Sequence, residues 1–228
     1  MDIVVTFSIF SADPLYGAVG MHMPDPDTEE LLKLAAQGDR SAVDALFAQH
    51  RDRLRCMVRL RMDRRLAARM DPSDVVQEAL MEAAGKLPEY LAKRPVPFYP
   101  WLRRLTWEKL VKLHERHRDA GKRSVLREEA VALELPDDSA LNLARRLAAQ
   151  GTSPSEQLVH EEMCERVRSA LARLPAGERE VLVLRYLEEL PTVEVAAVLQ
   201  ISEGAVKMRH RRALQRLSGF LQDPPRRR

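Results

Sequence analysis

The fold is decided by the segment Pro191-Thr-Val-Glu-Val-Ala-Ala-Val-Leu-Gln-Ile-Ser-Glu-Gly-Ala-Val-Lys-Met-Arg-His-Arg-Arg-Ala-Leu214. Its pattern is typical of two helices joined by a tight turn. The second helix has an apolar stripe when residues 203–217 are wound at about 100° per residue. That stripe consists of Val206, His210, Ala213, Leu214 and Leu217. The sequence therefore predicts a helix-turn-helix whose second helix packs by one side only.

The opposite side of this second helix is basic. It carries Gly204, Met208, Arg211 and Arg212, with Lys207 at its margin. A helix that packs by one stripe and is basic on the other side is suited to a DNA major groove. Arg211 and Arg212 are suited to guanine, and Met208 to apolar contact such as a thymine methyl group. Lys207 and Arg209 are suited to phosphate, and Ser202 is expected to cap the helix.

Charge is distributed unevenly along the 228 residues, although the formal net charge is only +3. Residues 51–69 hold eight Arg and two Asp, and residues 103–123 hold eight Lys or Arg and three acids. Residues 124–165 reverse this balance, with nine acids and three Arg. This alternation predicts a protein that contacts nucleic acid at two places joined by an acidic segment.

The composition favours an all-α soluble protein of the cytoplasm. Aromatic residues make up only 5% of the chain, whereas Ala, Leu, Arg and Glu are abundant. Cys56 and Cys164 lie far apart and form neither a disulfide framework nor a metal quartet, which favours a reducing compartment. No apolar run approaches the roughly 20 residues that span a bilayer, and the apolar first ten residues lack the positive start of a signal peptide. We therefore expect no membrane insertion.

Composition shifts and helix signals divide the chain into five parts. They are a disordered or spurious extension (1–24), a basic helical domain (25–123), an acidic linker (124–152), a four-helix domain (153–221) and a basic tail (222–228). The predicted fold is therefore two helical domains joined by a linker.

Within the first domain, Asp71-Pro-Ser-Asp74 is a strong helix start, with an Asp cap and Pro at the first helical position. We expect this helix to end at Gly85 and to be followed by a loop, since residues 86–97 hold three prolines. A further helix is expected from Pro100. The helical spacing of Phe98 and Trp101 predicts core packing for both rings.

Three ordered motifs resemble the extracytoplasmic-function subfamily of bacterial sigma factors, the promoter-recognition subunits of RNA polymerase. Asp71-Pro-Ser-Asp-Val-Val-Gln-Glu is similar to the family's region 2.2, and Phe98-Tyr-Pro-Trp-Leu-Arg-Arg-Leu-Thr resembles its regions 2.3 to 2.4. Leu174-Pro-Ala-Gly-Glu-Arg-Glu-Val-Leu-Val-Leu-Arg-Tyr and the helix-turn-helix resemble region 4. The resemblance covers about residues 27–221. The linker and Met208-Arg-His-Arg-Arg-Ala-Leu look most like the planctomycete-rich branch.

The resemblance implies a sigma factor that binds core RNA polymerase, directs it to specific promoters and starts transcription. Docking on the polymerase would use an acidic, hydrogen-bonding face formed by Asp74, Gln77 and Glu78. The promoter's minus-ten element would be held by the basic residues Arg103, Arg104, Lys109, Lys112 and Arg116. The minus-thirty-five element would be read by Ser202, Gly204, Lys207, Met208, Arg209, Arg211 and Arg212. Core RNA polymerase and promoter DNA are thus the expected partners, and an anti-sigma factor is a further candidate.

Besides Pro191, which stands where the family usually has a Ser or Thr cap, the sequence departs from the family pattern at two places. Gln200 occupies a turn position where the family usually has Gly, and a left-handed Gln there costs about 1 kcal/mol. Trp107-Glu108 replaces a common pair of a small residue and Asn. This second change puts the family's preference for bases near the minus-ten element in doubt.

We expect no enzyme, metal or cofactor. His114 and His117 are three residues apart on a helix, but no nearby Cys or acidic cluster supplies further ligands. The sequence shows no nucleophile–base set, phosphate-binding Gly loop or enclosed pair of carboxylates.

Two other classes of protein stay open at this stage. A free-standing helix-turn-helix regulator would bind operators, usually as a dimer, but would not explain Asp74, Gln77 and Glu78. A scaffold that sequesters other sigma-type proteins would use its basic faces for protein contacts.

Overall fold

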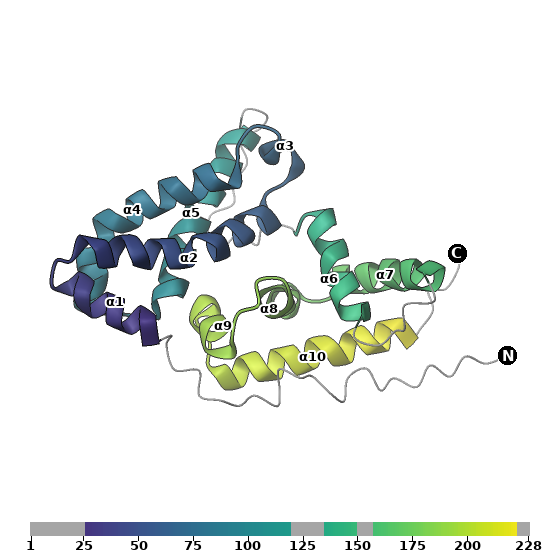
Figure 1. Cartoon of the computed structure of the whole chain (residues 1–228). Coiled ribbons are helices and arrows are strands. Elements are labelled where there is room, and N and C mark those ends of the chain that lie inside the picture. The colour runs from purple at the N-terminus through teal and green to yellow at the C-terminus, as the bar shows by residue number, and fades with distance from the viewer. Residues whose placement is uncertain (1–25, 120–134, 150–156, 223–228) are drawn as a thin grey trace.

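The computed structural model describes residues 26–119, 135–149 and 157–222, and every regular element in these ranges is an α-helix (Figure 1). The all-α prediction is therefore confirmed. In chain order the helices are α1 (Pro26–Ala36), α2 (Arg40–Arg61), α3 (Arg64–Ala67), α4 (Pro72–Lys93), α5 (Phe98–Asp119), α6 (Asp137–Ala149), α7 (Gln157–Ala172), α8 (Ala176–Tyr186), α9 (Thr192–Leu199) and α10 (Glu203–Gln222). The predicted extension 1–24 and all of the tail except Gln222 lie outside the described residues.

Aspartate caps fix the starts of three helices in the first half of the chain. Asp39 accepts hydrogen bonds from the N–H groups of Ser41 and Ala42, and Asp63 accepts one from Leu66. Asp71 accepts the N–H of Ser73 at 2.7 Å, with Pro72 in the first turn of α4. These bonds satisfy backbone donors that have no partner inside a helix. The helix start expected at Asp71 is confirmed.

The loop expected from Lys86 to Pro97 is wrong for most of its length, because α4 continues through Gly85 and Pro88 to Lys93. Packing accounts for the extension. Leu87 and Tyr90 are buried, and the Tyr90 ring stacks on Trp101 at 4.5 Å between centroids. These contacts outweigh the loss of one backbone hydrogen bond at Pro88, which a proline in a helix interior brings. The left-handed backbone of Arg94 ends the helix.

The acidic segment also contains a helix that the sequence analysis did not predict. Residues 137–149 form α6, which packs against α7. Leu143, Ala144 and Leu147 provide its buried stripe. Residues 137–149 of the expected linker are therefore helical, and residues 124–134 and 150–152 lie outside the described residues.

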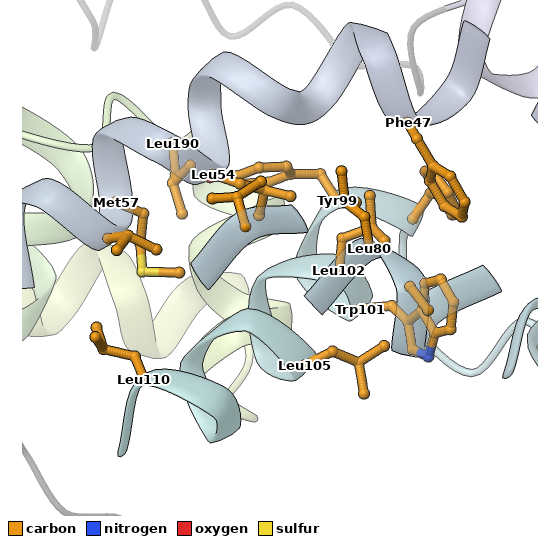
Figure 2. Packing of buried hydrophobic residues seen from close by; sticks show 14 of the residues in the cluster. Phe47, Leu54, Met57, Leu80, Tyr99, Trp101, Leu102, Leu105, Leu110 and Leu190 are labelled. Atoms are coloured by element: carbon orange, nitrogen blue, oxygen red, sulfur yellow. The ribbon is translucent and has the colours of Figure 1, made fainter. Parts of the chain in front are cut away.

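The described helices form two lobes that contact each other. We call α1–α5 the N-terminal lobe and α6–α10 the C-terminal lobe. The core of the N-terminal lobe continues into the other lobe, since residues such as Leu190 pack in the same cluster as Leu54 and Met57 of α2 (Figure 2). In addition, α9 packs against both α5 and α10. The helix-turn-helix is therefore held against the N-terminal lobe.

The aromatic residues in the first turn of α5 serve the core. Phe98 and Trp101 are 3% and 4% exposed, which confirms the packing predicted for them. Phe98 lies between Phe47 and Tyr90, at centroid distances of 6.4 and 5.5 Å. The expected start of α5 at Pro100 was two residues late, because Pro100 lies in the first turn, where its missing N–H has no helical partner in any case.

Candidate nucleic-acid and polymerase interfaces

Helix α10 has the two-sided form predicted for it. Val206, His210, Ala213 and Leu217 are buried, and His210 Nε2 lies 3.1 Å from the hydroxyl of Tyr186. Five candidate DNA-binding residues are exposed on the helix: Gly204, Lys207, Met208, Arg211 and Arg212. The basic side of α10 is therefore open to solvent, although its lobe packs against the other one.

The turn before α10 has the geometry that the sequence required. Gln200 is left-handed, with φ 54° and ψ 42°, and its N–H donates to the carbonyl of Ala196. Ser202 Oγ then accepts the N–H of Ala205 at 3.2 Å, so the expected cap is present. This turn fixes the direction in which α10 leaves α9.

Arg209 differs from the other candidates on α10. It is half-buried, and a Cβ placed on Gly177 would lie 3.5 Å from its Nη1 atom. The side chain thus packs against the first turn of α8 and lies beside the exposed basic side of α10, not within it.

The polar face of α4 is contiguous and exposed. Asp74, Gln77 and Glu78 all face solvent, and Met81 follows one turn later with 70% of its surface exposed. Only Leu34 and Met208 are also large exposed apolar residues in the part of the chain that the structure describes. A methionine ringed by polar groups is typical of a protein-binding surface.

The five residues of α5 that are candidates for binding the minus-ten element differ in their exposure. Arg104, Lys112 and Arg116 are exposed along the helix. Lys109 is half-buried and contacts Glu78 on the polar face of α4. Arg103 is buried, and is therefore not available to DNA in this arrangement.

Arg103 is buried because it forms an ion pair with Glu188 of the other lobe. Its Nε and Nη2 atoms donate to the two carboxylate oxygens at 2.7 and 2.8 Å. Arg61 Nη2 donates to Glu188 Oε1 at 3.1 Å, and the same guanidinium binds Glu180 at 2.6 and 2.9 Å. Burial opposes the charged form of Glu188, but the guanidinium groups of Arg103 and Arg61 outweigh it and lower the pKa of this carboxyl.

The role of Arg61 was not predicted from the sequence. One signal was available, because Arg61 follows Leu54, Met57 and Val58 at helical spacing. It therefore falls on the buried stripe of α2, where an arginine requires an acidic partner. The partners come from residues 119 and 127 positions later, which no local pattern indicates.

The described residues contain no group of three or more His, Cys, Asp or Glu side chains that could hold a metal ion. None of the helices described is both long enough and apolar enough to cross a membrane. Cys56 is half-buried and Cys164 is buried.

Residues 170–218, which include the helix-turn-helix, match the family "Sigma-70, region 4". Relatives that cover most of the chain exist as well. It is 31% identical over 198 residues to RNA polymerase sigma factor CnrH of Cupriavidus metallidurans, covering 87% of this chain and 96% of that protein. The chain belongs to the extracytoplasmic-function sigma factors of RNA polymerase.

Other relatives of this sigma factor carry the subfamily in their names. ECF RNA polymerase sigma factor SigD of Mycobacterium tuberculosis is 28% identical over 197 residues, covering 86% of this chain and 85% of SigD. SigW of Bacillus subtilis is 25% identical over 192 residues, covering 84% and 95%. A solved structure of CnrH in complex with the cytosolic domain of CnrY is 25% identical and covers 86% and 97%, with a TM-score of 0.49.

This sigma factor binds core RNA polymerase, directs it to promoters and promotes transcription initiation. The relatives cover most of this chain, whereas a free-standing helix-turn-helix regulator would not need the N-terminal lobe. Sigma factors are not enzymes, and the chemistry of RNA synthesis belongs to the polymerase.

Proposed function

We propose that three exposed surfaces divide the work of this sigma factor. The polar face of α4 docks on core polymerase, the basic residues of α5 hold the minus-ten element, and the basic side of α10 reads the minus-thirty-five element. The observation that carries the proposal is the exposed basic side of α10, opposite the stripe whose Val206, His210, Ala213 and Leu217 are buried. A helix with these two sides can enter a groove without disturbing its own lobe.

On α4, the docking surface combines charge with one apolar contact. Asp74 and Glu78 supply carboxylates one turn apart, Gln77 supplies hydrogen bonds, and Met81 supplies a flexible apolar side chain. Such a surface fits a basic helical partner, because complementary charge guides the encounter and the apolar contact excludes water. By resemblance to the subfamily, that partner is the coiled coil of the largest polymerase subunit.

On α5, Arg104, Lys112 and Arg116 form an exposed row. At about 1.5 Å rise per residue, the row extends roughly 18 Å along the helix. Positive charge at this spacing holds a nucleic-acid backbone without regard to sequence, since each phosphate contact releases counterions. The free energy of these contacts offsets part of the cost of separating the strands.

On α10, Arg211 and Arg212 are the residues suited to base recognition. A guanidinium bound to O6 and N7 of guanine provides about 1–3 kcal/mol of discrimination against another base. Lys207 and Arg209 contribute phosphate contacts, and Met208 an apolar contact to a base edge.

We also propose the finer assignments that accompany the family. Region 2 corresponds to residues 25–123 and region 4 to residues 153–221, and the acidic segment between them follows the basic path of the polymerase as a mimic of nucleic acid. An anti-sigma factor is a candidate partner, and the cytoplasm, where the polymerase works, is the expected location. Membership of the planctomycete-rich branch is supported only by the linker and residues 208–214.

Run-off transcription with reconstituted holoenzyme tests the proposal. Promoters selected from a random library should share two elements, and the combined Asp74→Ala and Glu78→Ala variant should lose polymerase affinity. A matched control removes two exposed acids elsewhere, Glu30→Ala with Asp44→Ala, and should retain affinity. Unchanged polymerase binding by the first pair would disprove the docking assignment.

A further inference from the structure

Arginines of the N-terminal lobe meet glutamates of the C-terminal lobe across the contact between the lobes. The pairs are Arg53 with Glu194, Arg61 with Glu180 and Glu188, and Arg103 with Glu188. At the centre of this set, the side chains of Arg61, Arg103 and Glu188 are 2%, 6% and 1% exposed. One lobe thus supplies the cations and the other the anions, all of them from helices or turns that lie far apart in the sequence.

A buried cluster of this kind is poorly explained as a source of stability. Removing charges from water carries a large penalty, which the attraction between them repays only in part. Apolar residues of similar size would hold two permanently joined lobes at least as well. Charged faces have another advantage, because each stays soluble when the lobes separate. The cluster therefore suits a contact that opens.

The arginine face has the chemistry of a single-strand binding site. The guanidinium carbons of Arg61 and Arg103 lie 5.4 and 5.9 Å from the ring centre of Trp107. Trp107 and Arg104 also line a hollow of about 420 Å³ that both lobes enclose. Arginines that bind phosphate beside an aromatic ring that can stack on a base are the elements with which proteins bind single-stranded DNA.

Glu188 binds this face as a phosphate group would. It takes two parallel hydrogen bonds from the fork of Arg103 and a third from Arg61. Carboxylate and phosphate share this two-oxygen geometry toward a guanidinium. A DNA phosphate and Glu188 cannot occupy the same donors at the same time.

We propose that Glu188 is a phosphate mimic that closes the C-terminal lobe over a single-stranded DNA site formed by Arg61, Arg103 and Trp107. In the closed sigma factor this site is covered, and promoter DNA reaches it only when the lobes separate. The inference rests on the proposed function, since it adds Arg61 and Trp107 to the minus-ten surface and explains why Arg103 is buried.

The test compares Glu188→Gln with Glu189→Gln in the full chain. Both variants remove one negative charge, but Glu189 is exposed and pairs with Arg146 of its own lobe. The probe is a fluorescein-labelled single strand of roughly 12 nucleotides, within the usual site size, and binding is followed by anisotropy. Glu188→Gln should bind about tenfold more tightly than wild type if about nine molecules in ten are closed. Its radius of gyration in solution scattering should rise, whereas Glu189→Gln should match wild type in both measurements.

Two further variants test whether the tighter strand binding depends on the proposed site. Adding Arg103→Gln or Trp107→Leu to Glu188→Gln should abolish the tighter binding. If Glu188→Gln folds poorly, as thermal unfolding would show, Glu180→Gln takes its place, because Glu180 is 25% exposed and contacts only Arg61 within the cluster.

The outcomes separate this inference from the proposed function. Wild-type protein that fails to start run-off transcription with core polymerase would overturn the proposed function. If wild type initiates transcription but Glu188→Gln, or Glu180→Gln in its place, changes neither strand affinity nor the radius of gyration, the proposed closure is wrong and the contact is purely structural. Tighter binding that survives Arg103→Gln would also overturn it.

Discussion

Lys109 Nζ lies 2.7 Å from Glu78 Oε2, and this ion pair joins α5 to the polar face of α4. The lysine belongs to the surface proposed for promoter DNA, and the glutamate to the surface proposed for polymerase. Since the two side chains hold each other, occupation of one surface changes the charge presented by the other.

We therefore expect the two binding reactions to be coupled through this pair. Glu78→Gln should weaken polymerase binding and, by releasing Lys109, strengthen binding of a single-stranded probe by up to a few-fold, since a half-exposed ion pair is worth about 0–1 kcal/mol. A double-mutant cycle with Lys109→Gln should show coupling, whereas a cycle with Lys112→Gln should not. Equal coupling in both cycles would assign the effect to general charge.

Base recognition by α10 and phosphate binding by α5 should be separable. Arg211→Ala should relax preference at one upstream position by about 1–3 kcal/mol, measured by promoter selection with holoenzyme. Arg116→Ala should instead weaken binding to all templates evenly and reduce the salt slope by about one unit. If Arg211→Ala lowered affinity evenly and left the preferred bases unchanged, Arg211 would be a phosphate contact.

The turn at Gln200 should be open to stabilisation. A left-handed backbone costs residues with a Cβ about 1–2 kcal/mol, which Gly avoids at the expense of a more disordered unfolded chain. Gln200→Gly should therefore raise the free energy of unfolding by about 0.5–1 kcal/mol in urea titration. Gln200→Ala keeps the strain and serves as the control. A destabilised Gln200→Gly would mean that the Gln side chain contributes contacts of its own.

The helix-turn-helix could be predicted from the sequence because its signals are local. The helical spacing of Val206, His210 and Ala213 predicts the packed stripe. The position of the turn follows from Ser202, the expected cap, which lies four residues before Val206. The same kind of reasoning failed at Pro88, where the usual helix-ending effect of proline is outweighed by the packing of Leu87 and Tyr90.

The contact between the lobes could not be predicted in the same way. Arg103 and Glu188 are 85 positions apart, and a charge pattern alone places an arginine of α5 on a DNA-binding surface. The acidic composition of residues 124–152 likewise hid the short apolar stripe of α6. In both cases long-range packing decides which polar residues are exposed, and periodicity gives no information on it.

Acid should affect the closed form only well below neutral pH. The pKa of Glu188 lies below its ordinary value of 4.5 when Arg103 and Arg61 bind it, and returns toward that value when the lobes open. The closed form thus binds fewer protons, so its stabilisation is complete above pH 4.5 and is lost as the pH falls through the lowered pKa. Solution scattering should show a constant radius of gyration from about pH 8 to 5. A rise near pH 6.5, the region where histidine titrates, would assign the control of closure to another group.

Leu190 should contribute more to closure than to the stability of its own lobe. It is 1% exposed and packs with Leu54 and Met57 of the other lobe (Figure 2), so Leu190→Ala removes apolar contact between the lobes. Truncating a buried leucine costs about 2–5 kcal/mol, and here much of that cost falls on the closed form. Binding of the single-stranded probe should therefore tighten. Leu187→Ala is the matched control, because Leu187 is buried within the C-terminal lobe and its loss should lower the free energy of unfolding without tightening strand binding. If both variants lowered stability alike and neither tightened binding, the lobes would unfold as one unit, with no open form in between.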